Sequence, residues 1–389
     1  MISFDNTEIA FRSKSNRDLK RAYWLFKAVG SSAFVKFGKW ATNLAFKLRL
    51  PIKGMIRKTI FRQFCGGESV KGSMKTMNSL AEYNVKTILD YSIEGKFADE
   101  DFDATVAEII QTIEAGGSNK NIPFAVFKMT GICLFDVLKN ANEGIDRLTL
   151  EDQNRYETLV ARVDRICATA LQHNVPVFID AEETWIQNTI DRIVQEMMAR
   201  YNKNHVIVYN TLQMYRHDRL EYLKEEIDRA KKENYHLGVK LVRGAYMEKE
   251  RERAEKHSYP SPIQPNKDAC DADFNHALRL SLDNIDTVAV CAGTHNEESS
   301  MLLTQIMAEK ELPNNHPSIY FAQLLGMSDH ISFNLANAGY NVAKYVPFGP
   351  VKEVMPYLLR RAEENTSVAG QTSRELKLIM KEIKRRKGK

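Results

Sequence analysis

The sequence lacks the patterns that mark most metal-binding and disulfide-bonded proteins. Its five cysteines are widely spread and include no CxxC pair, which indicates free thiols in a reducing compartment. Its nine histidines form no HxH or HExxH pair, so we expect no metal site. No apolar run reaches the roughly 18 residues that span a bilayer. The N-terminal stretch lacks the basic-then-apolar order of a secretory signal, and we therefore expect a cytoplasmic protein.

Charge is distributed unevenly along the chain, although the net charge is only +5. Residues 1–63 carry fourteen Lys or Arg against three acidic residues, with aromatic side chains at roughly helical spacing. One interpretation is an amphipathic surface that lies peripherally on the inner face of a membrane containing anionic lipid. The other is a pair of ordinary helices whose lysines face solvent. We do not expect nucleic acid as a partner, because no helix-turn-helix or ribbon motif is present.

Short β-rich runs alternate with helix-favouring stretches from residue 80 onward. Eight such runs are Lys86–Asp90, Ala125–Met129, Val177–Asp180, Val206–Tyr209, Val239–Arg243, Thr287–Cys291, Ser318–Phe321 and Val342–Tyr345. The helix-favouring stretches include Asp152–His173, Thr184–Arg200 and Ala269–Leu282. Eight strand–helix repeats with parallel pairing are typical of a (β/α)8 barrel. A doubly wound sheet also fits the alternation, but no GxGxxG follows any run, so a Rossmann nucleotide site is not indicated.

Polar residues stand where these runs end. In a barrel of this kind, catalytic groups lie at the carboxyl ends of the strands and in the loops that follow. Such positions hold Lys128, Asp180, Gln213, Arg243, His295 and Tyr345. Burying this many polar groups costs free energy unless they are paired or used, so we expect them to surround a functional site.

Two adjacent arginines, Arg360 and Arg361, follow the last run. They come after a turn at Phe348–Pro350 and a stretch from Val351 to Leu359 that favours helix. Neighbouring side chains on a helix point about 100° apart. Because two guanidinium groups side by side repel unless an anion lies between them, the pair suits a small carboxylate. The alternative is a solvated basic face.

Four segments together resemble the proline dehydrogenase family. They are Phe178–Glu183, Lys240–Tyr246, Thr294–Asn296 and Tyr357–Asn365. The resemblance covers roughly residues 55–375 and is closer to the single-function branch than to the long bifunctional bacterial enzymes. It implies a distorted (β/α)8 TIM-like barrel, non-covalent FAD, and oxidation of L-proline to Δ1-pyrroline-5-carboxylate with electrons passed to a membrane quinone. We expect a basic N-terminal helical segment (1–80), a catalytic barrel (81–375) and a basic tail (376–389).

The resemblance implies a set of residues on the substrate side. They are Glu94, Lys128, Asp180, Tyr246, Leu324, Tyr345, Arg360 and Arg361. Lys128 and the two arginines would bind the substrate carboxylate, and Asp180 would orient this basic cluster. Tyr345 would pack against the proline ring and crowd a 4-hydroxyl substituent. Glu94 would pair with Arg360 as an ionic gate over the closed pocket.

The flavin side is implied in the same way. Its residues would be Gln213, Lys240, Val242, Arg243, Gly244, Ala245, Thr294, His295 and Asn296. Many bacterial members of the family have Arg where this chain has Lys240, so the hydrogen bonding near flavin N5 is expected to differ. Two other functions are considered: a methylenetetrahydrofolate reductase-like flavin barrel, and a non-catalytic binding protein on a barrel scaffold.

Overall fold

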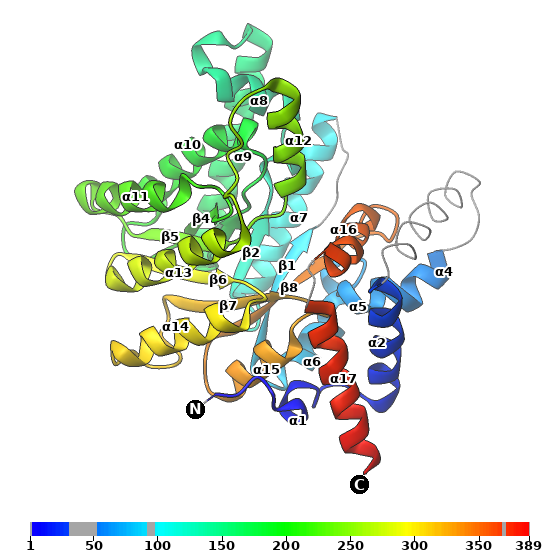
Figure 1. Cartoon of the computed structure of the whole chain (residues 1–389). Helices are drawn as coiled ribbons and strands as arrows, with labels where there is room; N and C mark the ends of the chain where they lie inside the picture. The colour runs from blue at the N-terminus through cyan, green and yellow to red at the C-terminus, as the bar shows by residue number, and fades with distance from the viewer. Residues whose placement is uncertain (1, 31–52, 92–97, 368–370, 389) are drawn as a thin grey trace. The chain divides into compact units, whose positions relative to one another are not determined.

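The fold is built around eight parallel strands that close into a barrel in chain order (Figure 1). The structure, a computed structural model, describes residues 2–30, 53–91, 98–367 and 371–388. The strands are β1 Val85–Tyr91, β2 Phe124–Phe127, β3 Val177–Ile179, β4 Val208–Gln213, β5 Leu237–Val242, β6 Val288–Gly293, β7 Ile319–Leu324 and β8 Val342–Phe348. Every β-rich run of the sequence contributes one strand, which confirms the (β/α)8 prediction.

Helices follow the strands along the chain. The longer ones are α2 Asn16–Val29, α6 Val70–Ala81, α7 Asp99–Gly117, α8 Phe135–Glu143, α9 Leu150–His173, α10 Thr184–Tyr201, α11 Arg219–Glu233, α12 Met247–His257, α13 Lys267–Asp283, α14 Glu297–Glu309, α15 Asp329–Asn337, α16 Met355–Ser367 and α17 Gln371–Lys387. Shorter ones are α1 Thr7–Ala10, α4 Lys53–Ile56 and α5 Arg62–Phe64, the last two joined by a π-helical turn at Arg57–Phe61. None of the described helices is long and apolar enough to cross a membrane.

Two predicted boundaries were wrong, each for a physical reason. The helix after β8 begins at Met355 rather than Val351, because Gly349 has a φ of +145° and residues 353 and 354 turn back onto the carbonyl of Pro350. Strand β4 extends to Gln213, beyond the predicted end at Tyr209. Its polar residues are buried, and Asn210 is hydrogen-bonded to Asp191 on the neighbouring helix α10, so polarity did not end the strand.

The described chain divides into two compact units, Gly95–Ala322 and a second unit made of Met1–Glu94 with Gln323–Lys389. Within the second unit, α17 lies beside α2, as the red and blue helices of Figure 1 show. Their shared core contains Phe11, Phe26 and Leu378. Both ends of the described chain therefore contribute to one hydrophobic cluster, which buries Phe11, Leu19 and Phe26 of the basic N-terminal stretch.

Candidate active site

In the Gly95–Ala322 unit, a lysine and an aspartate from neighbouring strands form a buried ion pair. Lys240 lies on β5 and is 5% exposed, while Asp180 directly follows β3. The Lys240 ammonium donates to the Asp180 carboxylate and lies 5.0 Å from the centre of the Phe178 ring. Burial raises the pKa of the neighbouring Cys291 thiol to about 12, an effect that the positive charge of Lys240 opposes. The pair therefore fixes the Lys240 ammonium beside its counter-charge, between β3 and β5.

The end of β5 is linked to the beginning of α14 by one guanidinium group. Arg243 donates to Thr294 Oγ1 at 2.7 Å and Ser299 Oγ at 3.0 Å, and its Nε donates to Asp271 at 2.7 Å. Asn296 caps α14, because its Oδ1 accepts the N–H of Ser299 at 2.9 Å. An arginine fork beside a helix N-terminus is a donor set that suits phosphate oxygens. These residues therefore fit the pyrophosphate of a dinucleotide cofactor.

Gln213 connects the loops that follow β3 and β5. Its Nε2 donates to the Glu182 carbonyl at 2.7 Å, and its Oε1 accepts the N–H of Ala245 at 3.4 Å. The Glu182 carboxylate accepts from Thr130 N at 3.0 Å and Thr130 Oγ1 at 2.5 Å. Burial raises the pKa of Glu182 to about 7, although nearby Lys128 opposes this. Sequence reasoning gave Glu182 no role, and its position within the Phe178–Glu183 motif was the signal available.

Gly244 occupies a conformation that other residues rarely adopt. Its φ is +132°, and a Cβ there would lie 2.3 Å from the ring of Tyr215. The family resemblance implied that Gly244 lies against the flavin. In the structure the close neighbour is Tyr215, whose backbone N–H also donates to the carbonyl of Arg243 at 2.7 Å. Glycine is therefore required here by packing between two barrel loops, independently of any ligand.

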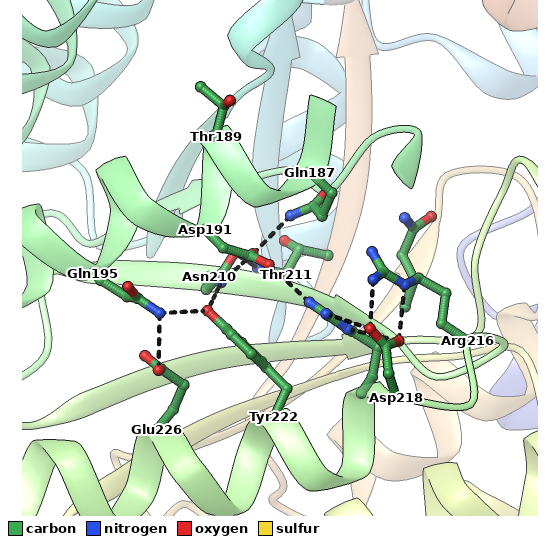
Figure 2. Close-up of polar contacts among 12 residues, drawn as sticks. Gln187, Thr189, Asp191, Gln195, Asn210, Thr211, Arg216, Asp218, Tyr222 and Glu226 are labelled. Atoms are coloured by element: carbon green, nitrogen blue, oxygen red, sulfur yellow. Dashed lines mark hydrogen bonds and ion pairs between the residues drawn. The ribbon is translucent and has the colours of Figure 1, made fainter. Parts of the chain in front are cut away.

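A buried polar network holds β4 between α10 and α11, as Figure 2 shows. The carboxylate of Asp191 accepts from Asn210 Nδ2 at 2.9 Å and from Arg219 Nη1 at 2.8 Å. Arg216 and Arg219 both donate to Asp218. Burial alone would raise the pKa of Asp218, but these hydrogen bonds hold it well below its usual range. The network explains how a strand with buried polar residues is tolerated, because each charge has a partner.

In the second unit, two residues expected at the substrate ring lie together. Leu324 ends β7 and Tyr345 lies within β8, and the N–H of Leu325 donates to the carbonyl of Tyr345 at 2.9 Å. The arginine pair lies on α16, where Arg361 is 8% exposed and its guanidinium carbon is 5.0 Å from the centre of the Tyr357 ring. The Tyr357 ring thus packs against the Arg361 guanidinium.

The remaining expected residues are placed as follows. Tyr246 caps α12 and is half-buried, and His295 lies in the loop between β6 and α14. Lys128 directly follows β2 and is half-buried. Glu94 lies outside the described residues. The described residues contain no group of three or more His, Cys, Asp or Glu side chains that could hold a metal ion.

Comparison with known proteins identifies related sequences and folds. A sequence model of the family described as "Proline dehydrogenase" matches residues 73–374. "Proline dehydrogenase 1, mitochondrial" of Dictyostelium discoideum is 32% identical, covering 98% of this chain and 74% of its own length. The protein of the same name from Arabidopsis thaliana is 31% identical, covering 97% of this chain and 85% of its own.

Solved structures show the same fold. Proline utilization A (PutA) from Bdellovibrio bacteriovorus, inactivated by N-propargylglycine, aligns with a TM-score of 0.73 at 19% identity. The alignment covers 93% of this chain and 38% of the PutA chain, so this chain corresponds to a part of that longer protein. At 19% identity the structural similarity supports the barrel architecture only. The family assignment rests on the sequence matches.

Proposed function

The chain belongs to the proline dehydrogenase family, which confirms the resemblance seen in the sequence, and on this premise we propose that it oxidises L-proline to Δ1-pyrroline-5-carboxylate with non-covalent FAD. Membership in this family supports an oxidoreductase activity toward proline. The observation that best supports the proposal is the set of polar residues at the ends of β3 to β6, where Lys240 pairs with Asp180 and Arg243 reaches the start of α14.

FAD would be held by the strand ends of the Gly95–Ala322 unit. The residues proposed are Gln213, Lys240, Val242, Arg243, Gly244, Ala245, Thr294, His295 and Asn296. The Arg243 guanidinium and the N-terminus of α14 suit the pyrophosphate, and Lys240 would provide positive charge toward the isoalloxazine. When bound, FAD would accept the hydride that leaves C5 of proline.

The substrate carboxylate would be bound by Lys128, Arg360 and Arg361. Leu324, Tyr345 and Tyr246 would pack around the proline ring. Asp180 would orient the basic side chains, which would fix the position of the substrate. The substrate amine must be unprotonated so that its lone pair assists hydride loss. We propose Glu94 as the acid that pairs with Arg360 over the closed pocket.

A membrane quinone is the electron acceptor that we propose. Helix α2 supports peripheral membrane contact, because Trp24 is 64% exposed and the Lys27 ammonium lies 5.2 Å from the centre of its ring. A basic and aromatic surface of this kind suits a headgroup interface. Binding of the purified protein to anionic but not neutral vesicles would support this part of the proposal.

An anaerobic titration tests the activity. Purified protein should show a flavin absorption spectrum that L-proline bleaches and NADH does not. Bleaching by NADH would instead indicate a methylenetetrahydrofolate reductase-like enzyme, and protein that takes up no flavin would indicate a binding protein. The Arg361→Met variant is the matched control, because it should keep the flavin spectrum but need much more proline for the same bleaching.

A further inference from the structure

A lysine is completely buried in the second unit, next to Tyr345. Lys344 lies on β8 and is 0% exposed. Its ammonium contacts Asp329 Oδ1 at 3.0 Å, donates to the carbonyl of Leu324 at 3.4 Å, and donates to the carbonyl of Met327. A buried ammonium requires acceptors for its three N–H groups, and these contacts supply three.

The contacts of Lys344 lie in and on either side of the turn after β7, residues 325–328. Met327 belongs to the turn, and Leu324 and Asp329 flank it. This turn is conformationally demanding, because Gly326 has a φ of +77° and Ser328 a φ of +50°. Gln63 donates to the carbonyl of Gly326 at 2.9 Å, and Glu375 on α17 accepts the N–H of Ser328. Backbone conformations of this kind persist only where surrounding contacts hold them. Lys344 contributes the side-chain contacts that β8 makes with this turn.

The charge on Lys344 is balanced locally. Asp329 shares its carboxylate between Lys344 and Lys14, whose ammonium lies 2.8 Å from Oδ2. Despite burial, these two lysines hold the pKa of Asp329 well below its usual range. A buried ion pair adds little net stability compared with apolar side chains of the same volume, but it does impose one geometry. Lys344 is therefore better explained by the geometry that it imposes on its partners than by a contribution to the stability of the protein.

The turn adjoins both residues expected at the substrate ring. Leu324 immediately precedes it, and the N–H of Leu325 donates to the carbonyl of Tyr345 at 2.9 Å. Lys344 and Tyr345 are adjacent on β8, so their side chains point to opposite faces of the strand. The Lys344 side chain therefore contacts the turn from one face of β8, while the Tyr345 side chain lies on the opposite face.

We propose that Lys344 is a positioning residue that sets the relative placement of Leu324 and Tyr345, and thereby the fit of a small cyclic amino acid. This inference rests on the proposed function, because it takes these two side chains as the wall of the proline pocket. Lys344 itself need not touch substrate. Its removal should affect substrate fit more than the rate of the chemical step.

The test is Lys344→Met, since methionine fills the space of the lysine stem without the charge. KM for proline should rise about tenfold, while kcat stays within about threefold of wild type. The amides of Leu325 and Met327 should exchange with deuterium at least about tenfold faster. Arg162→Met is the matched control, because Arg162 is also a buried cation, paired with Asp103 at 2.8 Å between α7 and α9. It should lower stability without changing KM or exchange in residues 325–328.

A folded Lys344→Met variant that binds proline as wild type does would overturn the proposal. Equal effects on KM and kcat in both variants would overturn it too, because they would indicate a general loss of structure. If Lys344→Met does not fold, Asp329→Asn, which keeps shape and weakens the hold on the ammonium, carries the same expectations. Should wild-type protein not oxidise proline, the proposed function fails, while amide exchange still decides whether Lys344 holds the turn.

Discussion

Replacing Asp180 with asparagine should destabilise the protein more than replacing Lys240 with methionine. The Lys240 side chain is 6% exposed and that of Asp180 is 15% exposed, so the lysine is the more deeply buried partner. Asp180→Asn leaves a buried ammonium without its counter-charge, and breaking a buried pair in this way costs about 3 kcal/mol or more. Lys240→Met instead leaves a carboxylate that is partly exposed to solvent and places an apolar side chain beside Phe178, and the expected cost is about 1 kcal/mol.

Thermal unfolding of the two single variants and the double variant measures the difference. A change of 3 kcal/mol should lower the Tm of this 389-residue chain by about 4 °C, and the double variant should be more stable than Asp180→Asn alone. Lys224→Met is a useful control, since Lys224 also pairs with a carboxylate, but its side chain and that of its partner Glu221 are 50% and 67% exposed, and the Tm should hardly change. Additive effects of Asp180→Asn and Lys240→Met would refute the idea that burial of the ammonium determines the cost.

Four further outcomes are expected. Arg361→Met should raise KM for proline about ten- to a hundredfold with flavin still bound, because a charge-assisted hydrogen bond contributes about 1.5–3 kcal/mol. Steady-state kinetics that show an unchanged KM would contradict the role of Arg361 in binding the substrate carboxylate. Gly244→Ala should reduce folded yield and flavin content together, since a Cβ would meet the Tyr215 ring and a φ of +132° is strained for any residue with a side chain; a wild-type yield of folded protein would contradict this. Tyr345→Ser should raise kcat/KM for 4-hydroxyproline relative to proline by about tenfold or less, and a fall in that ratio would count against packing on the ring. Burial raises the pKa of Glu182 from its ordinary value of about 4.5 to about 7, so wild type should lose up to about 3 kcal/mol of stability as pH rises from 4.5 to 7; urea unfolding of Glu182→Gln should lack this loss.

The barrel was predictable from the sequence because of how parallel strands are buried. Strands covered on both faces appear as short, continuous apolar runs, and eight of these separated by helix-favouring stretches leave few other architectures. All eight runs became strands. Polar residues that interrupt or follow such runs are conspicuous, which is how Asp180, Gln213 and Arg243 were found. The roles assigned to these residues came from resemblance to a family rather than from the pattern itself.

Other features depended on tertiary contacts that no local pattern contains. Lys344 stands within an ordinary apolar run, and its partners Asp329 and Lys14 belong to separate parts of the sequence. In the sequence, Gly244 is interpreted as part of a loop that binds the cofactor. In the structure its close neighbour is Tyr215, which lies on a different loop. Local sequence specifies whether a segment can form a strand or a helix. Which buried charge meets which partner depends on the packed structure, because a charge can be buried only where the fold brings its counter-charge to it.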